Sequence, residues 1–129
     1  MSKKLLVVGT MAYDAIETPY QKVDRILGGA ATYIALASSK FSTRCGLVSV
    51  IGDDFAPSDM EKLTSLGVNV DGVERVKGGK TFFWSGRYHD DMNTRTTMDT
   101  QLNVLENFSP QIPEEFKDSE VVVIGNLHP

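Results

Sequence analysis

The sequence predicts an α/β fold with a parallel sheet and a separate small β-rich part. Short continuous apolar runs, typical of buried strands, alternate with segments whose apolar residues recur at helical spacing. Their order of strand, helix, strand, helix and strand is typical of right-handed crossover units. Two segments, 15–27 and 81–102, interrupt that order. We expect them to form a structure outside the main sheet.

Three apolar runs have the pattern of buried parallel strands, at residues 4–9, 45–51 and 120–124. Residues 68–70 predict a further short strand. The first helix is expected over residues 30–41, where apolar side chains recur with a period of three to four.

A second helix is expected between the strands at 45–51 and 68–70. Ser58 and Glu61 have the spacing of a capping box, so this helix should open at Ser58. It should run to about Leu66, with Gly67 as its C-terminal cap.

Residues 81–102 predict a β-hairpin with two different faces. Its first strand places aromatic side chains on one face and Arg87 on the other. The turn-rich residues 90–93 are followed by β-branched threonines, which favour a second strand. We expect the hairpin to project as a flap, supported by strands within 15–27 because an isolated hairpin is unstable. The aromatic face consists of Phe82, Trp84 and Tyr88.

Composition limits the classes of function. A chain of 129 residues has the usual size of one domain, and its net charge of −4 argues against a nucleic-acid partner. No apolar run reaches the roughly 20 residues that span a bilayer. Cys45 is the only cysteine, so an internal disulfide is impossible and a cytoplasmic location is favoured. We expect Cys45 to be a small buried apolar residue rather than a reactive thiol.

Ligands of open α/β sheets bind beyond the carboxyl ends of the strands. Here those ends are residues 9–14, 52–55 and 125–128, so we expect three polar loops to line one crevice. Asp14 could accept hydrogen bonds from substrate hydroxyls, or it could cap a turn. For Asp53–Asp54, loop capping is preferred over binding of a cation or a hydroxyl.

Gly28 and Gly29 precede the first predicted helix. Their backbone could admit a ligand at the positive end of the helix dipole, or could only form a tight packed turn. Dinucleotide-binding and Walker glycine patterns are absent, as are the CxxC and HExxH patterns of metal sites. Of the two histidines, His128 near a strand end is the better candidate for catalysis.

Three motifs occur in order along the chain: GTMAYD at 9–14, GGAATY at 28–33 and VSVIGDDF at 48–55. In their residues and their spacing they resemble the ribokinase-like, or PfkB, family of sugar and nucleoside kinases. The resemblance covers essentially residues 1–129, but only the N-terminal part of a family member. It implies an incomplete Rossmann-like, ribokinase-type sheet with a small β-sheet lid, whose strands would lie within 15–27 and 81–102.

The resemblance also implies the roles of particular residues. Asp14 would hold substrate hydroxyls, and the glycine pair would pack against the substrate, admitting a sugar rather than a phosphate. Ala12 and Thr32–Tyr33 stand where many sugar kinases of the family have asparagine, so a nucleoside stacked on Tyr33 or on a lid aromatic is an alternative. The expected substrate contacts are Asp14, Gly28, Gly29, Tyr33, Arg87 and Asn126.

By resemblance, the intact enzyme would transfer the γ-phosphoryl group of ATP, with Mg²⁺, to a substrate hydroxyl. The family's D-T-x-G-A-G-D motif, which supplies the catalytic base and an anion hole, is absent; the only Asp-Thr step is Asp99-Thr100. We therefore expect no catalytic and no metal-binding residue in these 129 residues, and no activity of the chain alone. The sequence stops directly after a predicted strand, so we also expect it to be a fragment.

Two alternatives belong to other classes. The chain could be a non-catalytic module that binds a sugar or a nucleoside. It could also be an interaction protein that pairs through the aromatic face of the hairpin, and a homodimer through the lid would fit the family.

Overall fold

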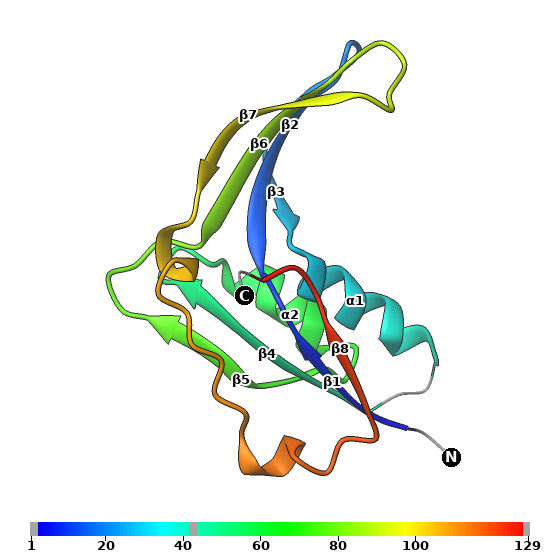
Figure 1. Cartoon of the computed structure of the whole chain (residues 1–129), viewed down its shortest axis with the longest axis vertical. Helices are drawn as coiled ribbons and strands as arrows, with labels where there is room; N and C mark the ends of the chain where they lie inside the picture. The colour runs from blue at the N-terminus through cyan, green and yellow to red at the C-terminus, as the bar shows by residue number, and fades with distance from the viewer. Residues whose placement is uncertain (1–2, 42–43, 128–129) are drawn as a thin grey trace.

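The computed structural model describes residues 3–41 and 44–127, which form two four-stranded sheets (Figure 1). The core sheet has the order β5-β4-β1-β8, and all of its strands are parallel. Each predicted strand of the main sheet is present, although β5 is longer than expected. The strands are β1 (Lys4–Val8), β4 (Arg44–Gly52), β5 (Asn69–Val76) and β8 (Val121–Ile124).

The second sheet, here called the lid sheet, has the order β3-β2-β6-β7 and rises from the core sheet as a curved arm (Figure 1). The predicted hairpin is confirmed, because β6 and β7 pair antiparallel. The two interrupting segments meet where β2 pairs in parallel with β6. The strands are β2 (Ala12–Glu17), β3 (Lys22–Gly28), β6 (Phe82–Tyr88) and β7 (Arg95–Gln101).

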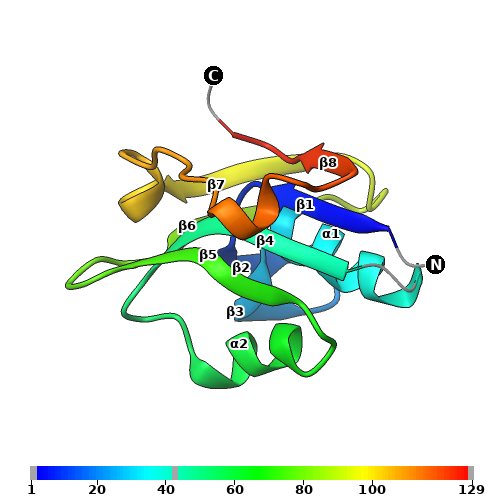
Figure 2. The same ribbon diagram turned by 90° about the horizontal axis from the view of Figure 1, so that it is seen from below.

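Helices α1 (Ala30–Ser38) and α2 (Pro57–Thr64) cover one face of the core sheet (Figure 2). The main hydrophobic core lies between them and the sheet, and Val7, Leu47 and Leu63 are completely buried in it. No helix in the described part of the chain is long and apolar enough to cross a membrane.

The opposite face of the core sheet is covered by an irregular segment instead of helices. This segment contains two short 3-10 helices, η2 (Asn103–Leu105) and η3 (Glu114–Phe116). Phe116 is buried from this side against Leu6, Val8 and Val48, in a second and smaller cluster.

The first helix has the expected position but buries a different face. Tyr33 and Phe41, two of the apolar residues whose spacing predicts the helix, are exposed. Ala31 and Ala35 are buried instead, because small side chains let the helix backbone lie close to the sheet. The helix is followed by a short 3-10 turn, η1 (Ser39–Phe41).

The second helix begins differently from the prediction and ends two residues early, at Thr64, with Ser65 as its C-cap. Ser58 is not its N-cap: Ala56 is, without a side-chain hydrogen bond, and Pro57 occupies the first turn. Proline suits that position because its fixed φ is helical and its missing N–H is not needed there. Gly67 is not the C-cap itself but closes the turn after it, with φ of 84° and an N–H bond of 3.0 Å to Thr64 O.

Strand β8 is present but is not buried as its apolar sequence suggests. It pairs only with β1, at the edge of the core sheet. Val122 is 53% exposed and Ile124 is 70% exposed. Residues 3–41 and 44–127 do not supply neighbours that would bury this strand. The apolar pattern of a segment shows that its side chains suit burial, but not whether anything covers them.

Candidate substrate-binding site

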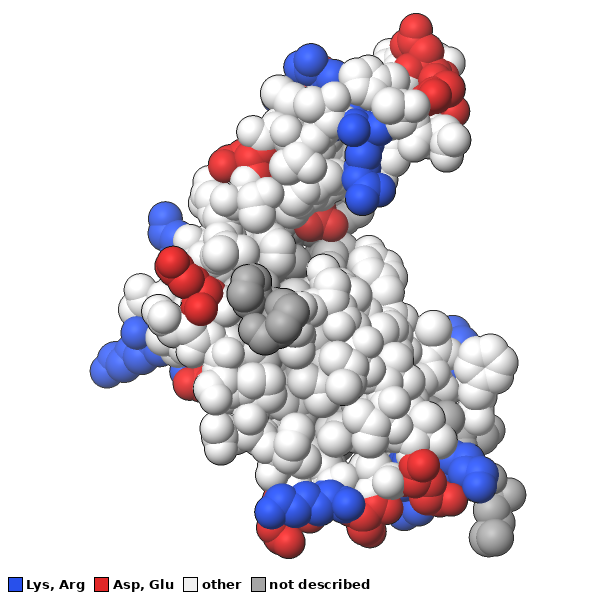
Figure 3. All heavy atoms as spheres, in the orientation of Figure 1, with Lys and Arg blue, Asp and Glu red and all other residues white. Residues whose placement is uncertain are grey.

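A pocket of about 330 Å³ lies where the lid sheet meets the carboxyl ends of β1 and β8. Figure 3 shows a concave surface at the junction of the arm and the body. The pocket brings together Asp14, Gly29 and Asn126 from the sequence-predicted contacts. The aromatic face of the hairpin also lines it, through Phe82, Trp84 and Tyr88.

Asp14 is the one acidic side chain that lines this pocket. It lies on β2 and is partly buried, and desolvation by burial raises the pKa of its carboxyl group above the ordinary value. Within the described residues its carboxylate accepts no hydrogen bond, so it does not act as a turn cap there. A partly buried carboxylate with free oxygens is suited to accept hydrogen bonds from hydroxyl groups.

The two glycines are explained first by packing within the chain. A Cβ at Gly28 would lie 2.6 Å from Asp14 Cγ, so the absence of a side chain at Gly28 makes room for the carboxylate. Gly29 has φ of 96°, and a Cβ there would lie 2.8 Å from Met11 Cα. Gly29 still borders the pocket, whereas Gly28 does not.

Thr10 occupies the donors at the start of α1. Its Oγ1 accepts the Ala30 N–H at 3.1 Å, and its carbonyl accepts the Ala31 N–H at 3.0 Å. The same hydroxyl donates to Asn126 Oδ1 at 2.8 Å, which links the loops after β1 and β8. These donors are therefore not free to cradle a phosphate group.

Sequence reasoning missed Thr10 and Arg95, which also line the pocket. Thr10 belongs to the loop 9–14 that is expected to line the crevice, but the motif does not single it out as a substrate contact. Arg95 pairs with Tyr88 across the hairpin, which puts it on the aromatic face. The pairing register of β6 with β7 could not be predicted from the residues of the turn alone.

Two more expected contacts, Tyr33 and Arg87, lie outside the pocket in addition to Gly28. The Tyr33 hydroxyl donates to Leu27 O at 2.7 Å, and its ring borders a different hollow. Arg87 Nε donates to Glu17 Oε2 at 3.3 Å, because the two residues are in register on β6 and β2. His128 lies outside the described residues.

The third expected loop, 52–55, does not line the pocket either. Asp53 accepts the Gly78 N–H at 2.6 Å, and Asp54 accepts the Thr81 N–H at 2.8 Å. The preferred interpretation of these aspartates as loop caps is confirmed. Their place in the fold is to hold the connection that leads into β6.

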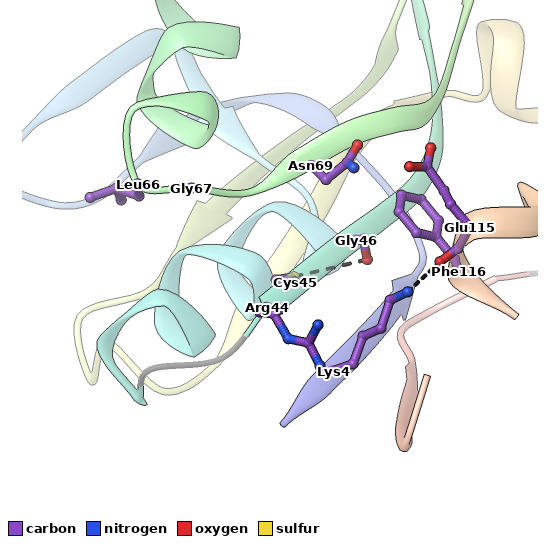
Figure 4. Close-up of a pocket in the computed structure, with 9 residues that line it drawn as sticks. All are labelled: Lys4, Arg44, Cys45, Gly46, Leu66, Gly67, Asn69, Glu115 and Phe116. Atoms are coloured by element: carbon purple, nitrogen blue, oxygen red, sulfur yellow. Dashed lines mark hydrogen bonds between the residues drawn. The ribbon is translucent and has the colours of Figure 1, made fainter. Parts of the chain in front are cut away.

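Another hollow, of about 310 Å³, lies at the amino ends of β1, β4 and β5 (Figure 4). Lys4 points into this region and donates to the carbonyl of Glu115 (Figure 4), and it also pairs with Asp118. Cys45 is buried here, which confirms the expectation of a small buried apolar residue, and burial raises the pKa of its thiol. Ligand sites of α/β sheets lie at the opposite, carboxyl ends.

The sequence profile of the pfkB family carbohydrate kinases matches residues 2–127. The chain belongs to the pfkB carbohydrate kinase family. Its α/β core with a second β-sheet is a partial ribokinase-like fold, as the sequence motifs imply. In this pfkB-family chain, the pocket lies between the lid sheet and the core sheet.

Known relatives and solved structures agree with this assignment. The cytidine kinase of Thermococcus kodakarensis is 29% identical over 126 residues, which cover 97% of this chain and 44% of the relative. The nucleoside kinase of Methanocaldococcus jannaschii has a TM-score of 0.73 at 20% identity, covering 96% of this chain and 45% of that chain. A nucleoside kinase from Burkholderia thailandensis in complex with ADP-inosine has a TM-score of 0.65 at 20% identity, covering 78% and 38%. The chain thus spans less than half the length of these proteins.

Proposed function

We propose that this chain forms the lid and part of the substrate site of an ATP-dependent kinase that phosphorylates a hydroxyl group of a sugar or a nucleoside. One observation carries the proposal: the Asp14 carboxylate lies in a pocket beneath the aromatic face of the lid sheet, in a chain of the pfkB family. The substrate contacts proposed are Asp14, Gly29 and Asn126, with Thr10 and Arg95 added.

Each group of lining residues has a distinct part in binding. Asp14 accepts hydrogen bonds from substrate hydroxyls, and its desolvation strengthens them. The aromatic side chains of the lid exclude water from the bound substrate. Gly29 lets the substrate approach the backbone where α1 begins.

ATP is the phosphoryl donor in this proposal, supported by the nucleoside kinase of Burkholderia thailandensis in complex with ADP-inosine. The residues described here do not offer a cradle for its phosphates at α1, because Thr10 occupies the first donors. They also contain no cluster of three or more side chains that could hold a metal ion. We assign the ATP and Mg²⁺ sites, and the catalytic base, to residues beyond these 129, and we expect the chain alone to be inactive.

Asp14→Asn tests the proposal directly. We expect the 129-residue chain to bind D-ribose or cytidine without ATP, and the substitution to weaken binding about 10-fold or more, since a charged hydrogen bond to the sugar is lost. Isothermal titration calorimetry measures both. Asp24→Asn is the matched control, because Asp24 is an exposed aspartate of the same sheet.

Two results would contradict the proposal. Absence of binding of either ligand by the folded chain would reject the pocket as a substrate site. Phosphorylation of either ligand by the 129-residue chain with Mg-ATP would reject the assignment of catalysis to other residues. A chain that binds ligand, in a gene that encodes no D-T-x-G-A-G-D motif, would favour the non-catalytic binding module.

A homodimer through the lid sheet and a cytoplasmic location complete the proposal. Strand β7 is the edge of the lid sheet and is exposed along its whole length, which leaves its outer edge open for pairing with a second copy. The aromatic face is not proposed as the dimer surface, because it lines the pocket.

The proposed cytoplasmic location is supported by the single buried cysteine, which is typical of cytoplasmic proteins.

A further inference from the structure

Thr81 connects the core to the first strand of the lid hairpin and is a buried polar residue. It directly precedes β6 and is only 2% exposed. Asp54 Oδ1 accepts hydrogen bonds from the Thr81 N–H at 2.8 Å and from its hydroxyl at 2.7 Å. The same hydroxyl oxygen accepts the Gly52 N–H at 3.0 Å. The start of β6 is thus fixed to the carboxyl end of β4 (Figure 1).

The other end of the hairpin is held at the same residue. Asn103 lies in η2, shortly after β7 ends, and its Nδ2 donates to Thr81 O at 2.9 Å. Next to it, the Val104 N–H donates to Lys80 O at 3.1 Å. The chain therefore enters and leaves the β6–β7 hairpin at one point, and Asp54 fixes that point to the core.

Asp54 also holds the other segment of the lid sheet. Arg25 lies on β3, and its guanidinium group donates to the Asp54 carbonyl at 3.0 Å. The Asp54 carboxylate is 3.9 Å from the same guanidinium group, but both side chains are partly exposed, so this ion pair adds little. Strand β2 separates β3 from β6, which are therefore about 10 Å apart in the sheet. A sheet held at two separate strands cannot rotate about either attachment alone.

The tilt of the lid sheet against the core sets the width of the substrate pocket, because the two parts form opposite walls. Asp14 and Phe82 belong to the lid sheet, whereas Ala30 of α1 and Asn126 after β8 belong to the core. Phe82 directly follows Thr81, so a shift of Thr81 moves a lining residue of the pocket.

We infer that Asp54 is a positioning residue that sets the tilt of the lid sheet and thereby the width of the substrate pocket. The inference rests on the proposed function, because it takes the pocket as the substrate site. Asp54 does not line the pocket, so it acts through Thr81 and Arg25 rather than by touching the substrate. A carboxylate suits this role, because hydrogen bonds to a charged acceptor are stronger than those between neutral groups.

Thr81→Val tests the attachment while keeping the shape of the side chain, since it removes only the hydroxyl between Asp54 and Gly52. We expect faster amide hydrogen exchange in β6 and β7, with exchange in β1 of the core sheet unchanged. In calorimetry, cytidine should bind about 5-fold more weakly or worse, because a hydrogen bond that positions the lid is lost. Thr81→Ser, which keeps the hydroxyl, should restore both properties.

Asp54→Ala should loosen the lid sheet more widely. It removes the acceptor of both Thr81 donors and the carboxylate beside Arg25, so we expect faster exchange in β3 as well as in β6. Cys45→Ala is the matched control, because it removes a buried side chain at the opposite end of β4. It should lower the free energy of unfolding in urea without changing lid exchange or cytidine affinity.

The outcomes separate this inference from the proposed function. Unchanged lid exchange in Thr81→Val, or an equal increase in Cys45→Ala, would show that Asp54 only caps its loop. Faster lid exchange with unchanged cytidine affinity would also overturn the inference, because binding would not depend on the tilt. Binding of neither cytidine nor D-ribose by the folded wild-type chain would reject the proposed function, and lid exchange in Thr81→Val would still confirm or overturn the attachment of the lid.

Discussion

Asp14 shows at the scale of one residue how the fold prepares a side chain for binding. Its place on β2, opposite the bare Gly28, leaves space for the carboxylate, and the lid strands shield it from water. Burial without a compensating hydrogen bond raises the pKa of the group above the usual value of 3.8. The folded protein thus keeps a charged group in a place that disfavours its charge, which is typical of a functional site.

Asp14→Asn should therefore affect stability in a pH-dependent way. Because the folded pKa is raised, the favourable contribution of Asp14 is present below the unfolded value, near 3.8, and is lost as pH rises through the folded pKa. At pH 7 we expect the variant to be at least as stable as the wild type, with the difference vanishing below about pH 4. Urea unfolding at the two pH values measures this. A variant that is less stable at pH 7 would show that Asp14 is structural.

At the scale of elements, the start of α2 is fixed by the lid sheet rather than by a local cap. The Tyr13 hydroxyl on β2 donates to Asp59 Oδ2 at 2.6 Å and accepts the Ala56 N–H at 2.9 Å. The guanidinium carbon of Arg25 on β3 lies 3.7 Å from the Tyr13 ring centroid. These contacts, here called the Tyr13 clamp, connect strands β2 and β3 of the lid sheet to the core.

The clamp also explains the charge state of Asp59. Burial would raise the pKa of this carboxyl, but hydrogen bonds from Tyr13 and Lys62 outweigh it, and the pKa is lowered. The ionised carboxylate is thus the form that the clamp stabilises, and its contribution is lost as pH falls through the lowered pKa.

Tyr13→Phe removes the hydroxyl and keeps the ring beneath Arg25. We expect the free energy of unfolding to fall by about 1–3 kcal/mol, because the partly buried Ala56 N–H loses its acceptor and the Asp59 carboxylate keeps only Lys62 as a donor. Chemical denaturation at pH 7 measures the loss. Tyr20→Phe serves as the control, since Tyr20 is exposed and should show no change. An equal loss in the two variants would mean that the clamp does not stabilise the fold.

For the whole molecule, the uneven covering of the core sheet is the dominant feature. Helices cover one face, an irregular segment covers part of the other, and the edge strand β8 exposes apolar side chains. Figure 3 shows a broad area without charged side chains over the body of the molecule. Apolar surface next to an unpaired strand edge favours association between chains.

Val122→Lys should reduce self-association of the 129-residue chain, because it places a charge on the exposed face of β8. Sedimentation velocity over a range of concentrations measures the effect. Thr64→Lys adds the same charge at an exposed position of α2, away from β7 and β8, and should change association less. If the two substitutions act equally, net charge rather than the β8 surface controls solubility.

Local sequence determined much of this protein. Continuous apolar runs identified the strands of the core sheet, alternation identified the aromatic face of the hairpin, and a carboxylate after the first strand identified Asp14. These features can be predicted because the spacing of apolar side chains and the residues of a turn involve only a few neighbouring positions.

Only the tertiary structure decided which of these residues meet. The pairing of β2 with β6 joins segments about 70 positions apart, and it places Trp84 beside Asp14 but Arg87 beside Glu17. Tyr33 was expected at the pocket, yet its hydroxyl bonds to the end of β3. Strand partners and register are set by contacts between distant segments, so the pattern of one segment identifies its faces but not what each face touches.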